Sequence, residues 1–355
     1  LDAQDAGGEF GDDVFAHVSA PGAVLIVGAA YSPRFWRLLS RRVRRSHIGF
    51  TMSKLPFVFI AGVLLAALPA FDSPFAQSMA LTCLMYAGLA VSWSMFSGPT
   101  RYLSLATSAF FGLGAYCTAW GLGKLPWPVV ILLGGLAAMV FAFLIGLVTL
   151  KLRGAYFAVI TYGLGELVKH TITHIEKTWF GTVGRVMTET PSSATVYWTV
   201  LIIAALAVWT YVAFGRSRYG HALRGIGMDE ERAATMGVNP MRVKLIGFCL
   251  SSWFAGALGA AMAVRWTYID PHTVFNPFIV FQTVLISMVG GPLTVAGPLI
   301  GALGFSLLSE YLRLSLPYLY LIILGVLLIV SVLYLPDGIA GYDWKKHFRR
   351  KEQKP

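Results

Sequence analysis

The sequence predicts an all-α, polytopic membrane protein with about eight to ten transmembrane helices. Of its 355 residues, 56% are hydrophobic and only 13% are charged, against roughly 25% charged in an ordinary soluble domain. So many apolar residues cannot all be hidden in a soluble core of this size, and much of the surface must face lipid. The apolar segments are long and lack the alternation of a membrane β-barrel. This composition excludes a soluble enzyme, a disordered chain and a disulfide-stapled secreted domain.

Apolar segments long enough to cross a bilayer follow one another from residue 55 onward. A crossing helix needs about 20 such residues. Ten spans are predicted, near residues 55–71, 76–97, 102–122, 127–150, 154–173, 194–214, 244–267, 277–296, 298–315 and 317–335. The third contains several glycines, and the eighth is interrupted by Gly290-Gly291-Pro292. Both could be broken or re-entrant helices, which a membrane tolerates only where protein or a water-filled cavity covers the backbone.

Lysines and arginines concentrate on one side of this predicted topology. The chain carries 28 of them against 17 acidic residues, which gives a formal net charge of +11. With the N-terminus inside, most of the 28 fall in segments that face the cytoplasm, and an even number of spans places the C-terminus there too. On a membrane protein such charge indicates cytoplasmic loops and contact with anionic lipid. No nucleic-acid partner is predicted.

Residues 1–51 differ in composition from the rest of the chain. An acidic, glycine-containing start is followed by a run of arginines, and Met52 stands just before the first apolar span. We expect residues 1–51 to be an over-extended reading frame or a poorly ordered cytoplasmic tail, with a basic amphipathic helix on the inner leaflet as the alternative. The transmembrane domain is expected to cover residues 52–338, and residues 339–355 to form a basic cytoplasmic tail.

The longest cytoplasmic insert between spans covers residues 215–243. Within it the sequence predicts a short helix, because an N-cap residue, two acidic residues and two small residues precede a terminating glycine: Asp229, Glu230, Glu231, Ala233, Ala234 and Gly237. Small side chains on one side of a helix let another backbone approach closely. The insert is therefore either a docking helix for a cytoplasmic partner or an ordinary solvated loop.

Residues 220–244 resemble the cytoplasmic loop of the branched-chain amino acid (Liv-type) permeases of ABC importers. The matching residues are Gly220, His221, Ala222, Leu223, Arg224, Gly225, Ile226, Asp229, Glu230, Ala233, Ala234, Met236, Gly237, Val238, Asn239, Arg242 and Lys244. Further blocks that look like this family occur in the expected order at residues 102–116, 151–166, 290–301 and 334–338. The resemblance covers roughly residues 86–338, and it is specific to this family because several spaced blocks occur in the right order.

This resemblance implies a permease subunit of an ABC importer in the bacterial inner membrane, forming the path for branched-chain or related amino acids. It implies as partners two ABC ATP-binding subunits, a second permease subunit and a periplasmic solute-binding protein. Residues 229–241 would form the coupling helix that docks into an ATP-binding subunit. The residues expected to take part in this coupling are Arg224, Asp229, Glu230, Glu231, Ala233, Ala234, Met236, Gly237 and Asn239.

Two stretches depart from the family pattern. Leu105-Ala106-Thr107 stands where the family often has Leu-Gly-His, and residues 180–186 lack the Asn of the usual Thr-Gly-Gly-x-Asn-Gly loop. The second departure leaves the solute open. The alternatives are a permease of the same family for urea, amides or aromatic acids, and an ATP-independent secondary transporter.

No catalytic chemistry is predicted for this chain. It has no P-loop motif, so ATP hydrolysis is expected in partner subunits, and no cofactor or metal site is predicted. An ionisable group inside a span suggests a functional role, and Glu166 is such a group. It could line the substrate path, or it could pair with Lys169 or with a neighbouring helix. The candidate residues of the substrate path are Ser104, Thr107, Thr161, Tyr162 and Glu166. Small residues around Gly256 and Gly297 predict close helix packing.

Overall fold

The computed structural model describes residues 74–316, except 188, 189 and 267, and a few isolated positions beyond Leu316. Residues 1–51, the tail 339–355 and the predicted spans 55–71 and 317–335 lie wholly or largely outside this part. Each of the other eight predicted spans corresponds to one helix: α4 (Pro74–Thr100), α5 (Thr107–Gly121), α6 (Trp127–Thr149), α7 (Ala155–Ile175), α8 (Ser193–Arg216), α11 (Pro240–Ala263), α13 (Pro277–Gly290) and α14 (Ala296–Ser315).

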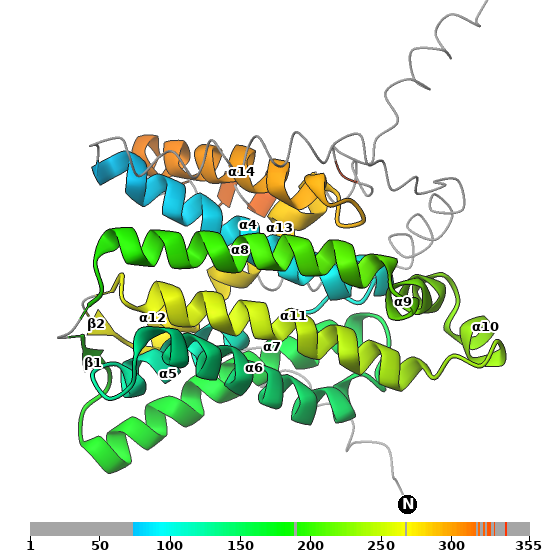
Figure 1. The fold of residues 1–355 in the computed structure, drawn as a ribbon, viewed down its shortest axis with the longest axis horizontal. Coiled ribbons are helices and arrows are strands. Elements are labelled where there is room, and N and C mark those ends of the chain that lie inside the picture. Colours follow the sequence, from blue (N-terminus) through cyan, green and yellow to red (C-terminus); the bar gives the residue numbers. More distant parts are fainter. Residues whose placement is uncertain are drawn as a thin grey trace, which may run out of the picture.

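Long helices run alongside one another between two ends of the molecule (Figure 1). One end carries α9 (Arg218–Met228) and α10 (Glu230–Thr235). The other carries the π-helix η3 (Glu176–Phe180), the short helix α12 (Pro271–Val274) and a two-stranded ribbon of β1 (Arg185–Val186) and β2 (Tyr268–Ile269), paired antiparallel. The predicted topology places the first end in the cytoplasm and the second outside.

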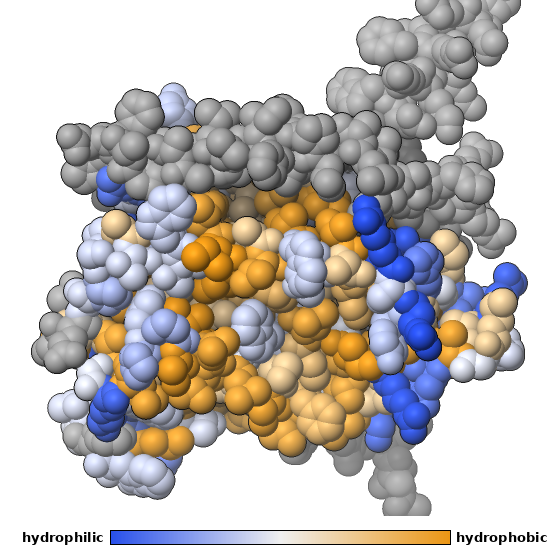
Figure 2. Space-filling view, viewed as in Figure 1, coloured by the Kyte–Doolittle hydropathy of each residue, from blue (hydrophilic) through white to orange (hydrophobic). Residues whose placement is uncertain are grey.

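Within the described residues, five segments are long and apolar enough to cross a membrane. They are Phe75–Thr100, Trp127–Thr149, Ser193–Arg216, Pro240–Ala263 and Pro271–Gly290, and Ala296–Leu312 is a shorter apolar helix. Figure 2 shows the corresponding hydrophobic band, with a hydrophilic stripe along the end that carries α9. Arg216, Arg218 and Arg242 belong to the elements at that end, as expected for a cytoplasmic surface. The structure is therefore an all-α polytopic membrane protein.

The centre of the bundle is α4, which is almost wholly buried, whereas α6 and α8 expose most of their surface. Along the middle of these two outer helices the exposed side chains are apolar, among them Leu132, Leu136 and Phe143 of α6 and Ile202 and Trp209 of α8. Apolar surface of this kind on long helices suits lipid.

Glycines bring α5, α6 and α11 into direct backbone contact. A Cβ atom at Gly114 of α5 would overlap the carbonyl group of Gly256 on α11, and one at Gly259 would overlap the backbone of Phe111. A Cβ at Gly290 of α13 would likewise overlap the backbone of Gly297 on α14. The predicted role of these small residues in helix packing is confirmed.

The two spans that were expected as possible broken helices differ. Helix α5 is continuous through Gly112 and Gly114 and is only shortened at its start, whereas the eighth span is interrupted after Gly290. Residues 101–106 are not helical, so α5 keeps only 15 residues of the predicted span 102–122. Helix α13 ends at Gly290, and a turn leads into α14. Tyr102, Ser104 and Leu105 are buried, so protein covers the irregular backbone of residues 101–106, which is the condition for such a segment at membrane depth.

Candidate functional site

The region between α8 and α11 is mostly helical instead of a loop. Helix α9 was not predicted, and α10 has six residues, Glu230–Thr235. The predicted termination of this short helix at Gly237 is confirmed, because Gly237 adopts φ +85°, a left-handed conformation that ends a helix. The extension of the helix to residue 241, which the resemblance implied, is therefore wrong. A new helix, α11, then begins at Pro240.

Side-chain caps fix both ends of this connection. The carboxylate of Asp229 accepts hydrogen bonds from the backbone N–H groups of Glu231 and Arg232, each at 3.1 Å. The side chain of Asn239 accepts one from the N–H of Arg242 at 3.2 Å and so caps α11. The predicted N-cap at Asp229 is confirmed, and Asn239 has the same role in the next helix.

The two alanines of α10 face opposite ways, contrary to the expected face of small residues. Ala233 is buried in an apolar cluster with Leu223, Ile226 and Val243, from α9 and α11. Ala234 is exposed. The buried alanine attaches α10 to the rest of the protein, and only Ala234 is free to meet another chain.

Beside Ala234, the outer surface formed by α10 and its flanking residues carries two exposed methionines, the exposed carboxylate of Glu231 and the exposed guanidinium of Arg232. Met228 is 69% exposed and Met236 is 85% exposed, while the side chain of Glu231 lies 3.6 Å from Arg153 and remains open to solvent. Among the coupling candidates, the structure brings Glu231, Ala234, Met236 and Gly237 to this surface.

Glu230 points inward instead, onto Lys244 of α11. Its Oε1 lies 2.8 Å from the Lys244 Nζ, its Oε2 accepts a hydrogen bond from the Tyr102 hydroxyl at 3.0 Å, and the Arg153 Nε lies 3.4 Å away. Burial alone would raise the pKa of Glu230, but Lys244 above all, with Tyr102 and Arg153, brings this pKa below its ordinary value of 4.5. Glu230 is therefore ionised.

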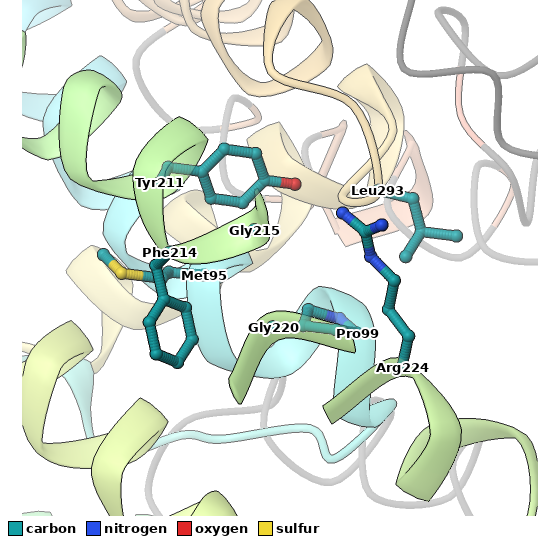
Figure 3. A pocket seen from close by; sticks show the side chains of 8 residues that line it. All are labelled: Met95, Pro99, Tyr211, Phe214, Gly215, Gly220, Arg224 and Leu293. Atoms are coloured by element: carbon teal, nitrogen blue, oxygen red, sulfur yellow. The ribbon is translucent and has the colours of Figure 1, made fainter. Parts of the chain in front are cut away.

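Arg224, also predicted to take part in coupling, lies where α9 meets α4, α8 and the turn before α14. Figure 3 shows its guanidinium beside Leu293 and near the Tyr211 hydroxyl, at a cavity of about 20 Å³. This volume holds about one water molecule. The Tyr211 hydroxyl donates a hydrogen bond to the Pro292 carbonyl at 3.1 Å. Arg224 faces this small cleft instead of the outer surface of α10.

Two of the path candidates, Ser104 and Thr161, are brought together by the non-helical segment 101–106. The N–H of Leu105 donates to the hydroxyl of Thr161 on α7 at 3.1 Å, and the Ser104 carbonyl accepts from the Trp93 Nε1 of α4 at 2.8 Å. Backbone hydrogen-bonding groups of this non-helical segment therefore find partners on the neighbouring helices α7 and α4.

The other path candidates lie nearby on α5 and α7. Thr107 is buried at the start of α5. Tyr162 stacks on Phe281 of α13 with ring centroids 6.1 Å apart. Glu166 forms an ion pair with Lys169, which is one of the pairings that the sequence left open. Both members of this ion pair belong to α7, so the positive charge of Lys169 balances the negative charge of Glu166 within one helix.

Two buried charged residues were missed by the sequence reasoning. Lys244 is 2% exposed and stands at the first position of a predicted span, where a lysine normally reaches out to the membrane surface. Glu176 is 1% exposed and accepts hydrogen bonds from the Tyr116 hydroxyl at 3.2 Å and the Gly184 N–H at 2.8 Å. It follows the predicted span 154–173, and no sequence signal marks its burial.

Comparison with known proteins places this site in a family. The family model described as "branched-chain amino acid transport system / permease component" matches residues 75–332. The permease LivM of Escherichia coli K12 is 26% identical over 329 residues, covering 82% of this chain and 76% of LivM. The probable permease LivH of Methanocaldococcus jannaschii is 27% identical over 262 residues, covering 70% of this chain and 77% of that LivH.

A shorter stretch of 134 residues is 28% identical to the L-arabinose permease protein AraH of Azospirillum brasilense, covering 35% of this chain and 40% of AraH. No solved structure matches the chain. The family model spans well over half of the chain and every element of the site. Together with the helical membrane fold, this makes the protein a permease subunit of an ABC importer. The chain belongs to the family of permease components of branched-chain amino acid transport systems, and it is a multi-pass protein of the bacterial inner membrane.

Proposed function

We propose that this chain and a second permease subunit form the membrane path for branched-chain or related amino acids. A periplasmic binding protein delivers the solute, and two ATP-binding subunits drive the transport. The observation that carries the proposal is the position of α10, which lies beyond the ends of the membrane helices with one surface uncovered (Figure 1).

The uncovered surface of α10 has the composition of a docking site. Met228 and Met236 are exposed at the end of the molecule farthest from the β1–β2 ribbon, where the expected neighbour is water and not lipid. Exposed apolar side chains in such a place favour a protein partner, and methionine adapts readily to a partner's shape. Ala234 is also exposed and offers no obstacle to close approach. These features support docking of an ATP-binding subunit on α10.

Transport by this arrangement is a change between inward-open and outward-open states. Closure of the ATP-binding subunits on nucleotide would displace α10, and the displacement would reorient the membrane helices. The chain itself makes and breaks no covalent bond. It needs no cofactor, because the ATP is bound and hydrolysed by the partner subunits.

Helix α7 is the element best suited to line the path. It exposes Gly163, Leu167 and His170, and it is not among the five apolar segments that suit lipid. Its exposed side mixes apolar residues such as Val159 and Leu167 with the polar His170 and with Gly163, which has open space around it. This mixed surface suits a second permease subunit and a solute path better than lipid alone. The partly exposed Tyr162 and Glu166 would then lie along the solute's route, and the buried Ser104, Thr107 and Thr161 would support it from behind.

A pair of tryptophan substitutions tests docking on α10. Ala234→Trp adds bulk to the proposed docking surface, whereas Ala205→Trp adds the same bulk to an exposed, lipid-facing position of α8. In vesicles that contain the complete transporter, we expect Ala234→Trp to abolish ATP-driven leucine uptake and Ala205→Trp to leave it unchanged. Equal uptake by both variants would show that α10 is not the docking element.

The solute is tested separately from docking. Isothermal titration of the periplasmic binding protein that stimulates this transporter would give its affinities for leucine, urea, amides and aromatic acids. Highest affinity for a branched-chain amino acid supports the proposal, and highest affinity for another solute selects one of the alternatives. Uptake that needs neither ATP nor the binding protein would identify a secondary transporter instead.

A further inference from the structure

The strongest unexplained feature is the buried ammonium group of Lys244. An ammonium has three N–H donors, and each has an acceptor: the Glu230 Oε1 at 2.8 Å, the Leu150 carbonyl at 3.0 Å and the Tyr102 hydroxyl at 3.2 Å. The three acceptors come from α10, the end of α6 and the segment 101–106. Lys244 itself belongs to α11, so a single charged group joins four parts of the chain.

The contacts around Lys244 form a closed triangle. The Tyr102 hydroxyl accepts from Lys244 and donates to the Glu230 Oε2 at 3.0 Å, while the Lys244 Nζ lies 4.7 Å from the centre of the Tyr102 ring. No member of the triangle can move away without leaving a buried charge or hydroxyl unpaired. Because such groups are costly to leave unpaired, α10 and Tyr102 are held at a fixed distance.

Tyr102 continues this connection toward the proposed path. Three residues later, the N–H of Leu105 donates to Thr161 of α7, and between them the Ser104 carbonyl accepts from Trp93 of α4. A displacement of Tyr102 therefore acts on a segment whose backbone hydrogen bonds lie on α7 and α4. The contacts form an unbroken series from α10 through the triangle to α7.

Apart from the triangle, α10 approaches the start of α7 at the protein surface, where the exposed side chain of Arg153, two residues before that helix, contacts Glu230 and Glu231. Ala233 packs on Leu223, Ile226 and Val243, which belong to α9 and α11. The exposed pair of Arg232 and Asp229 stays within the first turn of α10. A helix of six residues is not stable alone, so these contacts can hold α10 in place, and the triangle is what connects it to Tyr102 in the segment 101–106.

We propose that Lys244 is a positioning residue that makes α10 and the segment 101–106 move as one unit, so that displacement of α10 reaches Thr161 on α7. The proposal rests on the proposed function, because it assigns the route by which docking on α10 acts on the path. Arg153 is a lesser member, since its side chain is 61% exposed and it approaches Glu230 from the surface.

The first test measures solute taken up per ATP hydrolysed by the complete transporter in vesicles. Lys244→Met keeps the length of the side chain and removes its charge. Arg265→Gln is the control, because Arg265 contacts Ser78 elsewhere. We expect Lys244→Met to retain ATP hydrolysis and to lower uptake per ATP by about tenfold, within the usual range of allosteric coupling. Lys244→Arg should restore part of the ratio, and Arg265→Gln should not change it.

Wild-type uptake per ATP in Lys244→Met would overturn this proposal while leaving docking on α10 intact. If the wild-type transporter itself shows no ATP-driven uptake, the proposed function is refuted instead. A chain of contacts is a coupling route only when its disruption changes the coupling, and the ratio of uptake to hydrolysis reports this directly. A purely structural role would lower uptake and hydrolysis together.

A second variant covers the case in which Lys244→Met does not assemble. Tyr102→Phe keeps the ring and removes the hydroxyl that joins Lys244 and Glu230. In the full chain in lipid nanodiscs, we expect faster hydrogen exchange at two separate places, the amides of α10 and the amide of Leu105. A change at only one of them would show that they do not move as one unit.

Discussion

The Lys244 Nζ lies 2.8 Å from the Glu230 Oε1, and this contact joins the end of a membrane helix to the short helix that projects from the protein. The lysine side chain is 3% exposed and the glutamate side chain 18%. Neither charge has enough water around it to be stable alone. The pair therefore ties the short helix α10 to the buried interior of the protein.

Removing both members of this pair should destabilise the protein by less than the sum of the two single losses. Loss of one partner of a buried ion pair costs about 3–5 kcal/mol, and we expect the lower part of this range because Glu230 keeps some contact with water. Glu230→Gln and Lys244→Met should each lower the apparent melting temperature in detergent. The double variant should melt above the value expected from adding the two losses. Simple additivity would mean that the two charges do not interact.

The same pair predicts how stability depends on pH. Since the pKa of Glu230 is lowered by folding, its ionised form contributes stability above the unfolded pKa, and this contribution is lost as the pH falls through the folded pKa. The difference in melting temperature between wild type and Glu230→Gln should be constant at neutral pH and shrink below about pH 4.5. A difference that shrinks between about pH 8 and pH 6 would contradict the pairing.

Two glycines provide a matched test of helix packing. A Cβ at Gly114 would overlap the backbone of Gly256, whereas a Cβ at Gly163 of α7 meets no atom within 4 Å. Gly114→Ala should force α5 and α11 apart and destabilise the protein by about 1–3 kcal/mol or more. Gly163→Ala should leave the melting temperature unchanged or slightly raised. Similar behaviour of the two variants would contradict the close approach of α5 and α11.

Two threonines of α7 test the support of the segment 101–106. The Thr161 hydroxyl accepts from the Leu105 N–H, while the Thr171 hydroxyl is exposed and donates only within its own helix. Thr161→Val leaves a buried N–H without an acceptor and should cost about 1–3 kcal/mol. Thr171→Val should change stability by less than about 0.5 kcal/mol. Hydrogen exchange at Leu105 should rise only in Thr161→Val, and no rise there would disprove the contact.

Much of this structure could be predicted from the sequence, because lipid imposes simple rules on length and polarity. The eight predicted spans within the described residues each contain a helix. The interruption after Gly290 followed from Gly290-Gly291-Pro292, and the N-cap at Asp229 followed from its position before two acidic residues. These features depend on neighbours in the chain, and local patterns report them reliably.

Features that depend on distant residues could not be predicted in the same way. Helix α9 contains Gly220, Gly225 and Gly227, which disfavour a helix, and it is held because Leu223 and Ile226 are buried. The opposite orientation of Ala233 and Ala234 follows from the same packing. Lys244 meets Tyr102 across 142 positions in the chain, so the sequence could show a lysine at the start of a span but not its partners.

Cross-linking of α10 to an ATP-binding subunit is the most direct test of the proposed transport cycle. With a cysteine at position 236 (Met236→Cys) and cysteines placed in turn on the surface of the ATP-binding subunit, we expect a disulfide in the assembled transporter whose yield changes when ATP is bound. A cysteine at the exposed Leu206 of α8 (Leu206→Cys) should give none. Equal yields from the two positions, or none from position 236 in a transporter that imports leucine, would contradict docking on α10.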